Sequence, residues 1–149
     1  MTFLKSACLM ALMALGTPVL AQSDEWANLG ALIGSTLGPY TGDGGAVWLP
    51  DSADSARATE AIALLYQSSP TGGNAIQLTT GYFRKGANGF AFVGPLQGLF
   101  GMEPQDPRFF PDRIEVTTLT LGPDDPRCCP TKLIRWSIDR TTLRATQLP

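Results

Sequence analysis

The chain has 149 residues, with 11 lysines and arginines against 13 aspartates and glutamates, and it contains no histidine. The absence of histidine excludes Ser-His-Asp and Cys-His catalysis and removes the commonest ligand of zinc and copper sites. The mildly acidic balance, without a run of basic residues, argues against a nucleic-acid partner. An enzyme built on this chain would depend on carboxylates, lysine, tyrosine or cysteine.

The N-terminal segment, residues 1–21, has the pattern of a signal peptide. Lys5 supplies a positive charge, residues 7–15 form an apolar run, and small residues ending at Ala21 provide a cleavage site. The apolar run is shorter than the roughly 20 residues that span a bilayer. We therefore expect a periplasmic or secreted protein without a stable membrane anchor after cleavage, in which residues 22–149 form a single small β-rich domain.

The first element of the mature chain is predicted to be an amphipathic helix. Ser23 is a suitable N-cap residue. Apolar residues recur after it at helical spacing, at Trp26, Leu29, Ile33 and Leu37. The Gly-Pro pair at 38–39 ends the helix.

Two segments follow, one of which is ambiguous. Residues 46–49 predict a short apolar strand. Residues 58–67 are compatible with a helix because of their alanines, and with a strand because Ile62, Leu64 and Tyr66 alternate with other residues. We favour the strand and leave the helix as the alternative.

The centre of the chain predicts a β-hairpin and then a loop. Residues 75–84 alternate as a strand does, and a glycine-containing turn at 85–89 leads into a second strand at 90–93. Residues 101–112 contain three prolines, so we expect a surface loop there, with its two phenylalanines as anchors.

The last third of the chain predicts three more strands, at 113–121, 132–139 and 142–148. Apolar and polar residues alternate clearly in the first two of them. The expected fold class is therefore α+β, with one N-terminal helix packed on an antiparallel meander of five or six strands.

The segment between two of these strands contains an adjacent cysteine pair. Cys128 and Cys129 are the only cysteines that would survive processing, because Cys8 lies in the signal peptide. Neighbouring Cα atoms lie about 3.8 Å apart across a trans peptide bond, less than in an ordinary disulfide. A bond between the two sulfurs would restrain one turn and little else. An oxidising compartment favours this bond, whereas backbone strain opposes it, so the redox state stays open.

Asp125, Pro126 and Pro130 are expected to shape the cysteine loop, since each proline biases the preceding residue toward an extended backbone. We favour a local structural role for Cys128 and Cys129. The alternative is a strained, exposed pair that senses redox state or binds a soft metal such as Cu(I) as two thiolates. No catalytic residue, resident metal or cofactor is predicted.

Tyr82, Arg84 and Trp136 are the candidate binding surface. Aromatic residues in strands usually pack into the core. Tyr82 and its neighbour Phe83 point to opposite faces of their strand, however, so one of them could belong to an exposed patch. Exposed aromatic rings beside Arg84 would suit a protein or glycan partner.

The sequence Asp-Pro-Arg-Cys-Cys-Pro-Thr at 125–131, followed by Arg135, Trp136 and Leu143, resembles exported bacterial envelope proteins with an Asp-Pro-x-Cys-Cys-Pro-Ser/Thr tail, such as the LppP/LprE-type lipoproteins. These proteins have no assigned activity, so the resemblance implies a compartment and a loop rather than a reaction. This chain differs from them in lacking a usable lipobox. We predict a non-enzymatic binding or envelope-maintenance module with a protein or glycan partner in the envelope. A thiol-redox or soft-metal-handling protein that uses the cysteine pair is the alternative.

Overall fold

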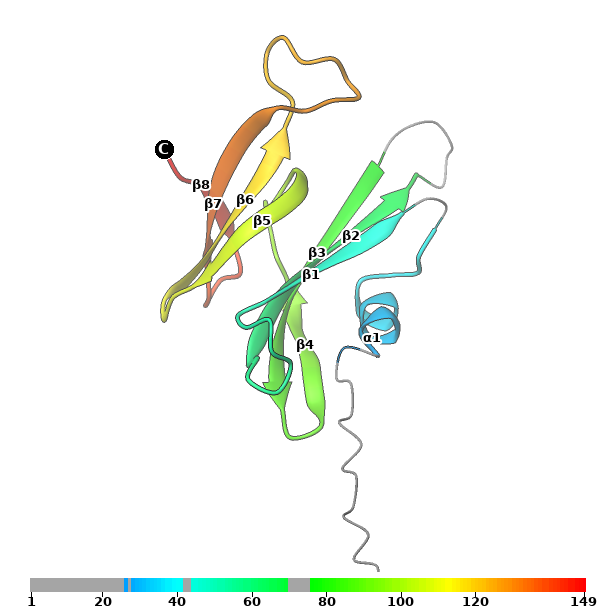
Figure 1. The fold of residues 1–149 in the computed structure, drawn as a ribbon, viewed down its shortest axis with the longest axis vertical. Helices are drawn as coiled ribbons and strands as arrows, with labels where there is room; N and C mark the ends of the chain where they lie inside the picture. The colour runs from blue at the N-terminus through cyan, green and yellow to red at the C-terminus, as the bar shows by residue number, and fades with distance from the viewer. Residues whose placement is uncertain (1–25, 27, 42–43, 70–75) are drawn as a thin grey trace, which may run out of the picture.

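The computed structural model describes residues 26, 28–41, 44–69 and 76–149, and these form one helix and eight strands (Figure 1). In chain order the elements are α1 (Leu29–Thr36), β1 (Gly45–Pro50), β2 (Glu60–Ser68), β3 (Ile76–Gly86), β4 (Gly89–Pro95), β5 (Met102–Phe109), β6 (Arg113–Thr120), β7 (Lys132–Asp139) and β8 (Ala145–Gln147).

The strands form two antiparallel sheets, which corrects the expected α+β fold with a single meander. The first sheet has the order β1-β2-β3-β4 and the second the order β5-β6-β7-β8. The described part of the chain is thus mostly β, and its helix has only eight residues. A sheet with one apolar face must bury that face against another layer, and here a second sheet supplies it.

The chain leaves the first sheet after β4 and crosses to the second. Leu96 and Leu99 are buried between the two sheets during this crossover. Gln97 forms a parallel bridge with Arg144, next to β8. Gly101 then turns the chain into β5 with a φ of 119°, a backbone conformation that a residue with a Cβ rarely adopts. The crossover divides what the sequence suggested was one continuous meander.

The surface loop expected at 101–112 is mostly strand, because β5 occupies Met102–Phe109. Its pairing with β6 shifts register twice, and Glu103 and Asp106 have φ values of 46° and 52°. Prolines are tolerated in edge strands and at bulges, where no ladder hydrogen bond is needed from their nitrogen. β5 is such an edge strand, so its prolines did not prevent a sheet.

Most of the other predicted strands are confirmed. The ambiguous segment 58–67 is strand β2, which pairs with both β1 and β3. The hairpin of β3 and β4 closes with Gly86 opposite Gly89. The strands predicted at 113–121 and 132–139 correspond to β6 and β7, and β8 is shorter than predicted.

The molecule has three layers, with α1 on one face of the first sheet and the second sheet on its other face (Figure 1). The core between the two sheets contains, among others, Ile62, Leu64, Tyr82, Val116, Trp136 and Ile138. The core between α1 and the first sheet contains Ile33, Leu37, Ala63, Leu65 and Phe83. Because both faces of β2 are covered, residues 61–65 are all buried. A strand that is buried on both faces needs no polar residues between its apolar ones, which explains why this segment was also compatible with a helix.

The helix is shorter than the sequence predicted. It begins at Leu29 after Asn28, whose side chain makes no capping hydrogen bond. The predicted N-cap, Ser23, lies outside the described residues, as does the predicted signal peptide. Ile33 and Leu37 are buried against the first sheet, as their helical spacing suggested. In the described part of the chain, no helix has the length and apolar character needed to cross a membrane.

Candidate functional site

An apolar cavity of about 280 Å³ lies at one end of the layer between the two sheets. One wall consists of Tyr66 of β2 with Ile76 and Leu78 of β3. Residues 100–102 at the start of β5 and residues 119–121 at the end of β6 form the opposite wall. Arg127 and Pro130 come from the loop that joins β6 to β7, at the top of Figure 1, and complete the lining.

The cavity continues the core toward solvent. Tyr66 and Leu78 pack against the core between the sheets. Farther out, large apolar side chains are exposed, with relative exposures of 56% for Ile76, 64% for Phe100, 40% for Met102 and 50% for Leu121. An apolar patch around a hollow is typical of a ligand or partner site, whereas single exposed apolar residues need no explanation.

Tyr66 joins the two sheets inside the cavity. Its hydroxyl donates a hydrogen bond of 3.0 Å to the backbone carbonyl of Gly101. Burial, with a smaller contribution from the negative charge of Glu103, raises the pKa of Tyr66 to about 12. The hydroxyl therefore stays protonated near neutral pH and is already engaged by the protein.

Two consecutive hydrogen bonds hold Phe100, at the rim of the cavity, against the second sheet. The indole Nε1 of Trp136 donates to Thr118 Oγ1 at 2.8 Å. The hydroxyl of Thr118 in turn donates to the carbonyl of Phe100 at 2.7 Å. A Cβ at Gly101 would clash with the Thr118 side chain. The backbone at 100–101 is thus held against β6 and β7.

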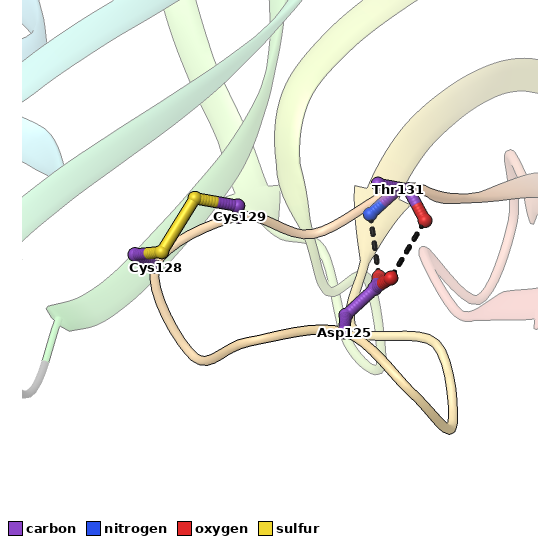
Figure 2. The surroundings of a disulfide bond; sticks show 4 residues. All are labelled: Asp125, Cys128, Cys129 and Thr131. Atoms are coloured by element: carbon purple, nitrogen blue, oxygen red, sulfur yellow. Dashed lines mark hydrogen bonds between the residues drawn. A yellow bond between two sulfur atoms is a disulfide. The ribbon is translucent and has the colours of Figure 1, made fainter.

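Asp125 holds the two ends of the cysteine loop together (Figure 2). Its carboxylate accepts hydrogen bonds from the backbone N–H of Gly122 at 2.7 Å, from the backbone N–H of Thr131 at 2.7 Å and from Thr131 Oγ1 at 2.8 Å. These bonds, that from Gly122 foremost, lower the pKa of Asp125. A turn within the loop is closed by the bond from Cys129 N–H to the carbonyl of Pro126, at 2.9 Å.

Cys128 and Cys129 form a disulfide within this loop (Figure 2). Their Cα atoms lie 3.8 Å apart, and the peptide bond between them is trans. Both residues are exposed. The pair lies in the chain between Arg127 and Pro130, which both line the cavity. Within the described ranges, no group of three or more Cys, Asp or Glu side chains could hold a metal ion.

The structure buries two of the three residues of the candidate binding surface. Tyr82 is 1% exposed and Trp136 is 5% exposed, because the two sheets face each other across both rings. Arg84 is exposed, and its guanidinium donates to Tyr82 Oη at 3.1 Å. These residues therefore do not form an exposed aromatic patch. Phe83, on the opposite face of β3, is buried beneath α1.

Tyr82 and Arg84 belong instead to a polar cluster at the other end of the layer between the sheets. The hydroxyl of Tyr82 donates to Glu60 at 2.5 Å, and Glu60 also forms an ion pair with Arg140. Arg140 follows β7, whereas Glu60 begins β2, so this ion pair links the two sheets. One end of the layer thus carries a polar cluster, and the opposite end carries the apolar cavity.

Sequence reasoning did not identify the cavity. The alternation of Ile76, Leu78 and Tyr82 indicated one apolar face of β3, but it did not indicate where the second sheet stops covering that face. Met102 lies in the segment 101–112 that was expected to be a surface loop, and Phe100 directly precedes it, so neither was assigned to a site. The signal that could have drawn attention to them is the group of large apolar residues Leu99, Phe100 and Met102 around Gly101, just before a proline-rich segment.

No protein family, curated protein or solved structure matches this chain. The likeness to the LppP/LprE-type lipoproteins stays a resemblance that covers the cysteine loop and a few residues after it. The description of the site therefore rests on its geometry.

Proposed function

We propose that this protein is an exported, non-enzymatic binding module that holds an apolar ligand in the cavity beside the cysteine loop. The observation that supports this proposal is the continuity of the cavity with the core. Tyr66 and Leu78 pack against the core between the sheets and also line the cavity, and its exposed rim carries Ile76, Phe100, Met102 and Leu121.

A ligand that covers this rim would gain free energy from the burial of apolar surface, at roughly 25 cal/mol per Å² before the costs of association. Water in the cavity finds few partners, because the Tyr66 hydroxyl is already bonded to Gly101. Displacing poorly bonded water with an apolar group favours binding. The volume of about 280 Å³ lies just below the usual range for ligand pockets, which suits a small or partly protruding ligand.

The lining is suited to binding rather than to acid–base or nucleophilic chemistry. Among the residues that the structure describes, the lining contains no carboxylate, lysine or cysteine side chain, and Arg127 is its only charged member. Catalysis of either kind needs a positioned proton acceptor or an activated nucleophile at the reacting atom. A binding role accounts for all of the lining residues without such a group.

A neutral fluorescent probe, N-phenyl-1-naphthylamine, tests the proposal. We expect its fluorescence to rise on binding to the protein. Leu121→Asp should weaken probe binding at least severalfold, because it places a charge on the apolar rim. Leu133→Asp is the matched control, since Leu133 is also an exposed leucine beside the same loop but does not line the cavity. Absence of probe binding, or equal loss in both variants, would contradict the proposal.

The proposed export rests on the signal-peptide pattern of residues 1–21. The intact mass of the protein recovered from the periplasm or medium tests it. A mass that begins at Gln22 supports export and cleavage after Ala21. Recovery of the full chain from the cytoplasm alone would contradict it.

A thiol-redox or soft-metal role for Cys128 and Cys129 is the second candidate. The exposure of both residues favours it, since solvent and a partner thiol can reach them. Thiol counting after mild reduction, followed by Cu(I) titration, would separate this role from a local structural one. A stoichiometric Cu(I) complex that is lost in the double serine variant would place this role first.

A further inference from the structure

The described lining of the cavity has a single charged residue. Arg127 reaches it from the cysteine loop, where the residue is exposed to solvent. In the structure of the described residues, the Arg127 side chain forms no hydrogen bond or ion pair with the protein. The neighbouring Asp125 carboxylate is engaged by Gly122 and Thr131. The positive charge at the cavity is therefore available to a ligand.

We propose that the ligand is a single-chain amphiphile with a carboxylate head group, whose tail occupies the cavity and whose head lies at Arg127. This inference rests on the proposed function and specifies its ligand class. A guanidinium matches a carboxylate in geometry, because two parallel N–H groups can donate to the two oxygens. The apolar walls of the cavity would contact the tail of such a molecule, and Arg127 would contact its carboxylate.

The size of the cavity limits the length of the tail. A cavity of about 280 Å³ is larger than the apolar cavities of roughly 150 Å³ that bind a benzene molecule. It therefore has room for a short alkyl tail, and part of a longer chain would extend past the exposed rim into solvent.

The ion pair at Arg127 is expected to contribute modestly, because the side chain is exposed. Exposed ion pairs contribute at most about 1 kcal/mol, or about a fivefold change in affinity. This contribution should decrease as salt is added, since added ions screen exposed charges. The tail should therefore supply most of the affinity, and Arg127 should select the acid over an uncharged analogue.

The test compares sodium octanoate with 1-octanol as competitors of N-phenyl-1-naphthylamine at neutral pH and low salt. We expect the native protein to bind octanoate about three- to fivefold more tightly than it binds 1-octanol. Arg127→Gln should remove this advantage, so that octanoate loses more affinity than octanol does. Arg108→Gln is the matched control, because Arg108 is an exposed arginine of β5 outside the cavity lining.

The outcomes separate this inference from the proposed function. If octanol competes as well as octanoate, or if Arg127→Gln and Arg108→Gln behave alike, the carboxylate assignment is wrong and the apolar site stands. If neither compound competes although the probe binds, the assignment is wrong as well. If the probe itself does not bind, the proposed function is wrong, and the inference fails with it.

Discussion

The hydroxyl of Tyr66 on β2 donates a hydrogen bond to the carbonyl of Gly101 at the start of β5, so one side chain ties the first sheet to the second at the cavity. The bond also provides a partner for the Tyr66 hydroxyl and for the Gly101 carbonyl at the edge of the core. A buried carbonyl without a partner costs free energy, so this contact serves both the stability of the fold and the shape of the site.

Tyr66→Phe should lower the free energy of unfolding by about 1 kcal/mol, because it removes the donor to Gly101 and keeps the ring. Urea denaturation measures the change. Tyr40→Phe is the control, since Tyr40 is exposed and its hydroxyl forms no hydrogen bond within the described structure. An equal effect of the two substitutions would contradict the assigned role of the Tyr66 hydroxyl.

The raised pKa of Tyr66 predicts a loss of stability at high pH. The pKa is about 12 in the folded protein and about 10 in an unfolded chain. A raised pKa favours the protonated form, so its contribution is complete below about pH 10 and is lost as the pH rises toward 12. Unfolding followed at pH 9 and pH 11 should show a steeper decline for the native protein than for Tyr66→Phe. Parallel declines would contradict the assignment.

Thr118→Val should destabilise the protein by about 1–3 kcal/mol, although the two side chains have nearly the same shape. The substitution leaves the buried Trp136 Nε1 without its acceptor, and an unsatisfied buried donor costs about this much. It also removes the hydroxyl that donates to the partly buried carbonyl of Phe100. Thr118→Ser keeps the hydroxyl and should retain both bonds. A valine variant as stable as the serine variant would show that these bonds do not support the rim.

Gly101→Ala should be more destabilising than Gly89→Ala. Both glycines have positive φ, at 119° and 95°, and this conformation costs a residue with a Cβ roughly 1–3 kcal/mol. At Gly89 the added Cβ would meet open space, whereas at Gly101 it would clash with Thr118. The difference between the two variants in thermal denaturation therefore measures the packing of the cavity rim. Equal losses would show that the rim adjusts without cost.

The double substitution Cys128→Ser and Cys129→Ser should fold with only a modest loss of stability. The disulfide joins neighbouring residues, so it closes almost no loop and restrains the unfolded chain very little. The bonds of Asp125 to Gly122 and Thr131 hold the loop independently of it. Complete failure to fold would contradict a local role for the cysteine pair.

Asp125→Ala should loosen the cysteine loop more than the loss of the disulfide does, because it removes all three bonds that join the loop ends. Amide hydrogen exchange over residues 122–131 measures this.

The lowered pKa of Asp125 predicts how the protection of this loop depends on pH. The contribution of Asp125 to stability is complete above its unfolded pKa of about 3.9 and is lost as the pH falls through its lower folded pKa. Protection that persists at pH 4 and disappears in stronger acid is the expected result. A loop that exchanges equally in the native protein and in Asp125→Ala would contradict this role.

The sequence by itself determined which residues share a face of a strand. The alternation of Leu78 with its neighbours in β3, and of Val116 and Trp136 in β6 and β7, was sufficient because side chains in a strand point to opposite faces with a period of two. The hairpin between β3 and β4 was also predictable, since its turn chemistry is local. Asp125, Pro126 and Pro130 likewise indicated the cysteine loop, because the preferences of these residues for turns are also local.

Only the tertiary structure decided what covers each face. The division into two sheets depends on the crossover at 96–101 and on pairings between distant segments, which a local period does not specify. Proline indicated a loop at 101–112, but an edge position allowed β5 to form there. Tyr82 is buried and Ile76 is exposed on the same face of the same strand, because the second sheet covers one end of β3 and leaves the other end open as the cavity.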